Sequence, residues 1–154
     1  MRGYGTPPPA AADTSSAPLP ALVRAWAAGV LVLALTEYVQ MEAVHGPLVG
    51  PRGVGSFGAA LVLVHLPNLL CVVLATWAAA RAHPEPWRGS PVRHAAAGCA
   101  VPAAAQVLTL SLHWDRAGPS APALWMSTAV ALAGCAAGML LDAWREGREE
   151  RGGR

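Results

Sequence analysis

The sequence is short of charged residues and contains no lysine. Only 13% of its 154 residues are charged, about half the share that is usual in a soluble domain. All 11 basic residues are arginines, and a formal net charge of +2 is too small to indicate a nucleic-acid-binding protein. The excess of arginine and alanine is typical of a GC-rich bacterial genome, so it reflects coding bias and not chemistry.

Motifs that carry enzymatic chemistry are also missing. The chain has no phosphate-binding P-loop, no HExxH and no GxSxG sequence. Its three cysteines lack the CxxC spacing of a redox or zinc motif, which argues against a disulfide framework. His65 is the only histidine well inside an apolar segment, so a haem held between two facing histidines is not expected. These absences predict a protein that is not an enzyme and holds no cofactor.

What the sequence does contain is a set of four long apolar segments. Hydrophobic residues make up 54% of the chain, and a helix needs about 20 apolar residues to cross a bilayer. The segments that meet or nearly meet this length are residues 21–41, 57–80, 95–112 and 122–143. Because short links force neighbouring helices to run antiparallel, the predicted fold is an all-α, up-down, four-helix transmembrane bundle over residues 21–144.

The two ends of the chain differ from this domain. Residues 1–20 are rich in Pro, Ala and Ser, which predicts a disordered tail. The first apolar segment starts late and three more follow it, so we interpret it as an uncleaved membrane anchor. Residues 145–154 mix Arg with Glu and predict a charged, solvated helical extension that frays at Gly152.

The distribution of arginine predicts the orientation of the bundle. Arginines gather in cytoplasmic loops and near the cytoplasmic ends of membrane helices. Placing both termini in the cytoplasm puts these arginines inside: Arg2, Arg24, Arg81, Arg88, Arg93, Arg145, Arg148, Arg151 and Arg154. Only Arg52 and Arg116 then lie outside. We therefore predict a multi-pass protein of the plasma membrane with cytoplasmic termini.

Four polar side chains lie at membrane depth, where an ionisable group is costly and points to function. Counting 1.5 Å per residue from the outer end of each segment puts Glu37 about 6 Å deep and Gln106 about 9 Å deep. By the same count His65 lies about 12 Å deep and Asn68 about 16 Å deep. His65 and Asn68 are three residues apart and are expected to share a helix face. These residues could line a polar pocket that opens outward.

Prolines and small residues predict how the helices pack. Pro67 and Pro102, each about 15 Å deep, are expected to kink their helices beside the pocket. The alternative is that the prolines are ordinary for membrane helices and that the polar groups join the helices through hydrogen bonds. Gly134 and Gly138 form a GxxxG in the fourth segment. We expect the fourth helix to pack closely on the third through small residues, or to form the seam of a homodimer.

The three cysteines and the segment after the first apolar run give two further predictions. Cys71, Cys99 and Cys135 fall at one depth of about 20 Å on three helices, where thiols could bind a soft ion such as Cu(I). Because cysteine also packs as a small hydrophobic residue, we expect no metal site there. Residues 42–56 contain turn-forming glycines and prolines and are expected to form an outer loop. The alternative is that the first helix continues past Met41, which would place Tyr38, Glu42 and His45 on one face and could pair Glu42 with His45.

Two classes of function fit this pattern. The first is an accessory or scaffold subunit that acts by helix–helix packing, with the lipid bilayer and another membrane protein or a second copy as partners. It predicts polar side chains satisfied within the bundle and no open cavity. The second is a small transporter or a ligand- or proton-sensing subunit, and it predicts a cavity lined by the four polar residues. The sequence favours the first class.

Overall fold

A computed structural model describes residues 18–48, 54–84, 87–117 and 122–153. Residues 1–17 of the predicted disordered tail lie outside the described residues, as do Arg2, Arg52 and Arg154. The described residues form helices and no strand, which confirms the all-α prediction.

Each long rod of the fold is a helix or a run of helical segments. The first rod comprises α1 (Pro18–Gln40), a π-helical turn η1 (Met41–His45) and α2 (Gly46–Leu48). The second comprises α3 (Phe57–Ala60), a π-helical turn η2 (Leu61–His65) and α4 (Leu66–Ala82). A short 3₁₀ turn η3 (Trp87–Gly89) leads into α5 (Pro91–Ala117), and the last rod is α6 (Pro122–Gly152). All four are long and apolar enough to cross a membrane, judged by length and composition.

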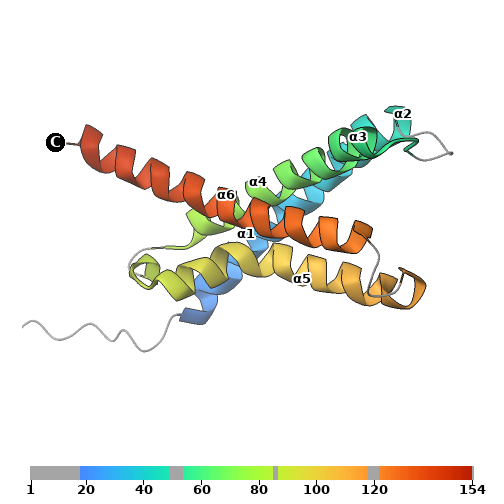
Figure 1. Cartoon of the computed structure of the whole chain (residues 1–154). Coiled ribbons are helices and arrows are strands. Elements are labelled where there is room, and N and C mark those ends of the chain that lie inside the picture. The colour runs from blue at the N-terminus through green and yellow to red at the C-terminus, as the bar shows by residue number, and fades with distance from the viewer. Residues whose placement is uncertain (1–17, 49–53, 85–86, 118–121, 154) are drawn as a thin grey trace, which may run out of the picture.

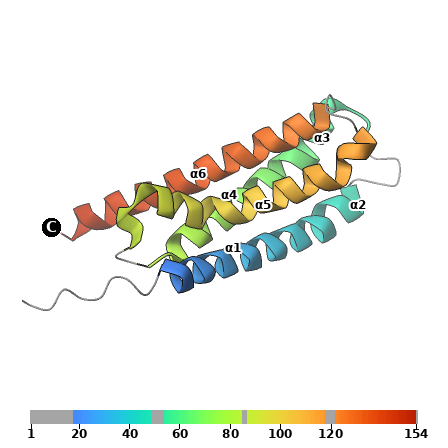
Figure 2. The ribbon, with the colours of Figure 1, turned by 90° about the horizontal axis from the view of Figure 1, so that it is seen from below.

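The four rods lie side by side in Figure 2, with neighbouring rods running in opposite directions, and Figure 1 shows that the first two rods cross the last two at an angle. The start of α1 and the end of α6 lie at one end, which we call the terminal end. The segments α2 and α3 lie at the opposite end, which we call the loop end. Helix α4 contacts α1, α5 and α6 and is the centre of the bundle.

Large apolar side chains face outward on all four rods, as expected for helices solvated by lipid. Leu31 of α1, Leu70 of α4, Val107 of α5 and Leu132 of α6 are all exposed. The buried core is instead made mostly of alanines, such as Ala75 at 0% exposure, with Leu33 and Val72 among its larger members. A membrane bundle gains little from burying leucine, because lipid is equally apolar, and it gains more from bringing backbones close together.

The first helix continues beyond the end that the sequence predicts. We expected a loop to begin at Glu42, but residues 41–48 continue the rod through η1 and α2. The acidic side chain of Glu42 does not end the helix, because Ala43 and Val44 follow it and neither breaks a helix. The loop prediction is therefore wrong for residues 42–48. Counted from Leu48, Glu37 lies about 16 Å along the rod, level with Asn68 counted from Phe57.

Both π-helical turns end two residues before a proline. Turn η1 ends at His45 and precedes Pro47, while η2 ends at His65 and precedes Pro67. Proline has no backbone N–H and its ring collides with the carbonyl four residues earlier. A locally wider turn accommodates that collision without ending the helix. The kinks themselves stay a prediction, as does the one at Pro102, which is buried inside α5.

The two glycines of the GxxxG lie against α4. A Cβ on Gly134 would sit 2.5 Å from Val72 Cγ1, and one on Gly138 would sit 2.7 Å from Thr76 Cβ. We had expected the third helix, α5, as the partner, and α5 approaches α6 through a different glycine, Gly98 beside Met139. The glycines therefore bring the second and fourth rods together within one chain.

Candidate functional site

A polar cavity lies between all four rods in the half of the bundle nearer the loop end. Its volume is about 140 Å³, and Glu37, Asn68 and Gln106 line it together with Pro102 and Ser127. Three of the four residues predicted to form a pocket thus meet at one site. A shared level on the rods brings them together, and for Glu37 that level follows from the extension of the first helix to Leu48.

His65 does not line this cavity. It ends the π-helical turn η2, whereas Asn68 lies in α4. The prediction that they share a face assumed regular α-helical spacing. Because η2 has a different number of residues per turn, that spacing no longer fixes their relative direction.

Gln106 is held by two hydroxyl groups from α6. Its Nε2 donates to Thr128 Oγ1 at 3.0 Å, and its Oε1 accepts from Ser127 Oγ at 3.0 Å. Thr128 Oγ1 in turn donates to the carbonyl of Leu124 at 2.9 Å. The amide is therefore satisfied by the protein, as the helix-joining alternative expected, and it fixes one wall of the cavity.

Glu37 and Asn68 are in a different situation. Neither side chain forms a hydrogen bond or ion pair with any residue that the structure describes, and the side chain of Glu37 is exposed. Glu37 also lines a second hollow, the apolar groove, of about 600 Å³ between α1 and α5. Leu33, Glu37 and Ala105 line both hollows, so the cavity and the groove adjoin beside these three residues.

The three cysteines do not come together. The Cys71 thiol donates to Gln40 Oε1 at 3.3 Å, beside Leu33 and Ala75. Cys99 and Cys135 contact each other, and Cys135 Sγ also accepts from Thr76 Oγ1 at 3.8 Å. Within the described ranges, no group of three or more His, Cys, Asp or Glu side chains is placed to hold a metal ion.

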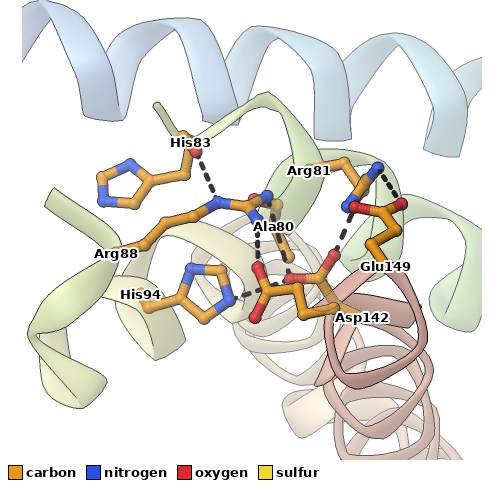
Figure 3. Close-up of polar contacts among 8 residues, drawn as sticks. Ala80, Arg81, His83, Arg88, His94, Asp142 and Glu149 are labelled. Carbon is orange, nitrogen blue, oxygen red and sulfur yellow. Dashed lines mark hydrogen bonds and ion pairs between the residues drawn. The ribbon is translucent and has the colours of Figure 1, made fainter. Parts of the chain in front are cut away.

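The sequence analysis missed a second polar region, at the terminal end. Asp142 of α6 is completely buried, with a side-chain exposure of 0%. Its Oδ2 lies 3.0 Å from His94 Nε2 and 3.9 Å from Arg88 Nη2, and its Oδ1 lies 4.0 Å from Arg81 Nε (Figure 3). We call these residues, together with Glu146 and Glu149, the charged cluster.

Arg88 is the centre of the charged cluster (Figure 3). Its Nε donates to the carbonyl of His83 at 2.8 Å and its Nη2 to the carbonyl of Ala80 at 2.9 Å. These carbonyls lie at the C-terminal end of α4. The Ala80 carbonyl also accepts from the backbone N–H of His83 at 3.2 Å, so the guanidinium is a second donor there, gives the His83 carbonyl a partner and complements the helix dipole. Arg88 also pairs with Glu146 of α6. One side chain therefore fixes the linker between α4 and α5 onto α6.

A sequence signal for this cluster existed. Asp142, Glu146 and Glu149 are spaced at i, i+4 and i+7, which places three carboxylates on one face of a helix. The sequence analysis interpreted Glu146 and Glu149 as part of the solvated tail and gave Asp142, at the end of the apolar segment, no role. Of the partner arginines, Arg81 lies in the last turn of α4 and Arg88 in the proline-containing linker after it, whose path the sequence does not predict.

The fold and the two polar regions define the class of this molecule as a helical protein with four rods capable of spanning a membrane. Comparison with protein-family models, curated proteins and solved structures found no match to this chain. Its function must therefore be inferred from its own geometry.

Proposed function

We propose that the protein is a small transporter or ligand-sensing subunit that binds a molecule at the polar cavity and the apolar groove beside it. The observation that supports this most directly is the Glu37 carboxylate, which lines both hollows and has no partner among the described residues. This is the second of the two classes that the sequence left open.

The physical argument rests on what satisfies each polar group. A charged side chain within a membrane usually pairs inside the protein or lines a path for a ligand or ion. Gln106 has protein partners, and Glu37 does not. The fixed amide of Gln106 also keeps one wall of the cavity in place, which favours a preformed site.

The experiment is a thermal-stability measurement on the purified full-length protein in lipid nanodiscs. A panel of small acids, amines and neutral amphiphiles is added, and the shift in Tm is compared between the wild type and Ala105→Phe, which fills the shared wall of both hollows. Glu149→Gln, at the terminal end, is the matched control. We expect at least one compound to raise the Tm of the wild type and of the control but not of Ala105→Phe. If no compound does so, the proposed function is wrong.

An accessory role is the second candidate, and a feature of α6 favours it. The last turns of α6 extend past the other rods at the terminal end (Figure 1), with Arg145, Arg148 and Arg151 exposed. Arg145 lies over the ring of Trp77 and Arg148 over that of Trp144, which leaves Arg151 as the more accessible cation for a partner.

The accessory role is tested by placing a photo-crosslinking amino acid at position 151 in cells. We expect one membrane protein to be crosslinked and to co-purify, and we expect Arg148→Glu with Arg151→Glu to abolish the co-purification. The same pair of substitutions should leave the thermal stability of the isolated protein unchanged. A purified protein that binds or moves a compound with no partner present would argue against this role.

A further inference from the structure

We propose that the ligand of this site is a lipophilic organic cation, such as an aryl- or alkyl-substituted ammonium or phosphonium ion. Its cationic centre would lie at Glu37 and its apolar body in the groove between α1 and α5. This inference rests on the proposed function and adds the chemical class of the ligand.

The apolar groove has the shape of a site for a compact hydrophobic body. It has a volume of about 600 Å³, and along α1 it extends from Trp26 to Glu37, about 16 Å at 1.5 Å per residue. Ala100 and Ala104 of α5 provide space where larger side chains would fill it. Trp26 is held at the terminal end of the groove, because its Nε1 donates to the carbonyl of Ala96 at 3.3 Å.

The charge of the site selects the sign of the ligand. Among the residues that the structure describes, Glu37 is the only charged one that lines the apolar groove or the polar cavity, and no arginine does. An anion would meet a carboxylate with no counter-charge, while a neutral molecule would leave that carboxylate unpaired beside apolar walls. A cation satisfies Glu37, and its attraction is strengthened by the low dielectric constant of the membrane.

The path into the site favours a lipophilic ligand. The groove is open on one side, and its flanking residues Val30 and Leu108 are exposed on the outer surface of the rods. In a membrane these residues face the acyl chains, so a ligand can reach Glu37 sideways from the lipid. Behind Glu37, the polar side chains of Asn68 and Gln106 can hydrogen-bond to an ammonium group or to its water.

Two probe ions of the same shape and opposite charge test this proposal. Binding of tetraphenylphosphonium and of tetraphenylborate is measured by equilibrium dialysis on the full-length protein in nanodiscs, after subtraction of binding to empty nanodiscs. We expect the phosphonium to bind at least about tenfold more tightly than the borate, because only the phosphonium complements the carboxylate. Glu37→Gln should weaken phosphonium binding by about tenfold or more and leave borate binding unchanged or improved.

Variants of the groove separate the class of ligand from the existence of the site. Ala104→Phe should weaken binding of both ions, because the added ring occupies the groove. If Ala104→Phe does not elute as a single peak on size exclusion, Ala100→Leu is used as the groove-filling variant instead. Glu149→Gln should bind like the wild type.

Each remaining outcome is decisive. Equal binding of the two ions, or phosphonium binding that survives Glu37→Gln, overturns the cation proposal. If Ala104→Phe nevertheless abolishes binding of the probe ions, the groove is a binding site, and the proposed function stands without the proposal that its ligand is a cation. Absence of binding by either ion also overturns the cation proposal, and the proposed function then fails only if the compound panel gives no stabilisation.

Discussion

Two carboxylates in opposite halves of the bundle differ in their burial and in the partners around them. Asp142, at the terminal end, is completely buried and has His94, Arg88 and Arg81 around it. Glu37, in the half nearer the loop end, is exposed and has no partner among the described residues. The difference indicates that the first holds the helices together and that the second is available to something outside the chain.

The contrast has a structural cause. At the terminal end, the linker after α4 is short and turns back over the helix ends, so Arg88 can reach both the last carbonyls of α4 and two carboxylates of α6. In the other half, the described polar side chains join α5 to α6 through Gln106 and α1 to α4 through Gln40 and Cys71. Between α1 and α5 a groove remains that reaches Glu37. One half is closed by ion pairs, and the other stays partly open.

The largest effect should come from removing the buried carboxylate. Asp142→Ala removes the partner of His94 Nε2 and one of the two carboxylates beside Arg88, which keeps Glu146 and the carbonyls of Ala80 and His83. Because breaking a buried pair costs about 3–5 kcal/mol of unfolding free energy and Arg88 keeps its other partners, we expect a loss at the lower end of that range. The measurement is equilibrium unfolding in mixed micelles of dodecylmaltoside and SDS. Asp142→Asn, which keeps the shape and removes the charge, should lose less than Asp142→Ala.

Glu149→Ala is the control for that prediction. The Glu149 side chain is 63% exposed and lies 3.2 Å from Arg81, so its loss should cost less than about 1 kcal/mol. Equal losses for Asp142→Ala and Glu149→Ala would mean that the charged cluster does not hold the terminal end together.

The next effect should come from the close approach of α4 and α6. Gly138→Ala places a methyl group 2.7 Å from Thr76 Cβ and 2.9 Å from the carbonyl oxygen of Val73, which is fixed backbone. Such overpacking costs about 1–3 kcal/mol in the same unfolding measurement. Gly147→Ala meets nothing within 4 Å and should instead stabilise the helix by up to about 1 kcal/mol. A neutral Gly138→Ala would show that the two rods can separate slightly.

A smaller effect is expected at the wall of the polar cavity. Gln106→Leu removes two side-chain hydrogen bonds between α5 and α6, each worth about 0.6 kcal/mol in a membrane, so the expected loss is about 1 kcal/mol. The matched change Ser111→Ala removes only a bond to the carbonyl of Val107 in the same helix and should be close to neutral. If the two variants unfold alike, Gln106 does not fix the wall.

The smallest effect on stability should be at Glu37. Because its side chain is exposed and unpaired among the described residues, Glu37→Gln should change the unfolding free energy by less than about 0.5 kcal/mol. A loss as large as that of Asp142→Ala would remove the contrast between the two carboxylates, since Glu37 would then be a structural residue.

Parts of this site could be predicted from the sequence. The four spans and the meeting of Glu37, Asn68 and Gln106 followed from apolar length and from counting residues along each segment. The count nevertheless placed Glu37 too near the end of its helix, because it ended the first helix before Glu42 and the rod continues to Leu48. It also placed His65 beside Asn68, since regular α-helical spacing does not anticipate a π-helical turn before a proline.

The sequence alone determined the class of structure. The length of each apolar segment and its lack of charge are properties of that segment, and they do not depend on which other segments it contacts. Only the tertiary structure decided which helix faces of distant segments meet. It placed Gly134 and Gly138 against α4, closed Asp142 with residues from α4, the linker and α5, and left Glu37 without a partner among the described residues. Helix rotation and the path of a short linker set those contacts, and neither leaves a periodic signal in one sequence.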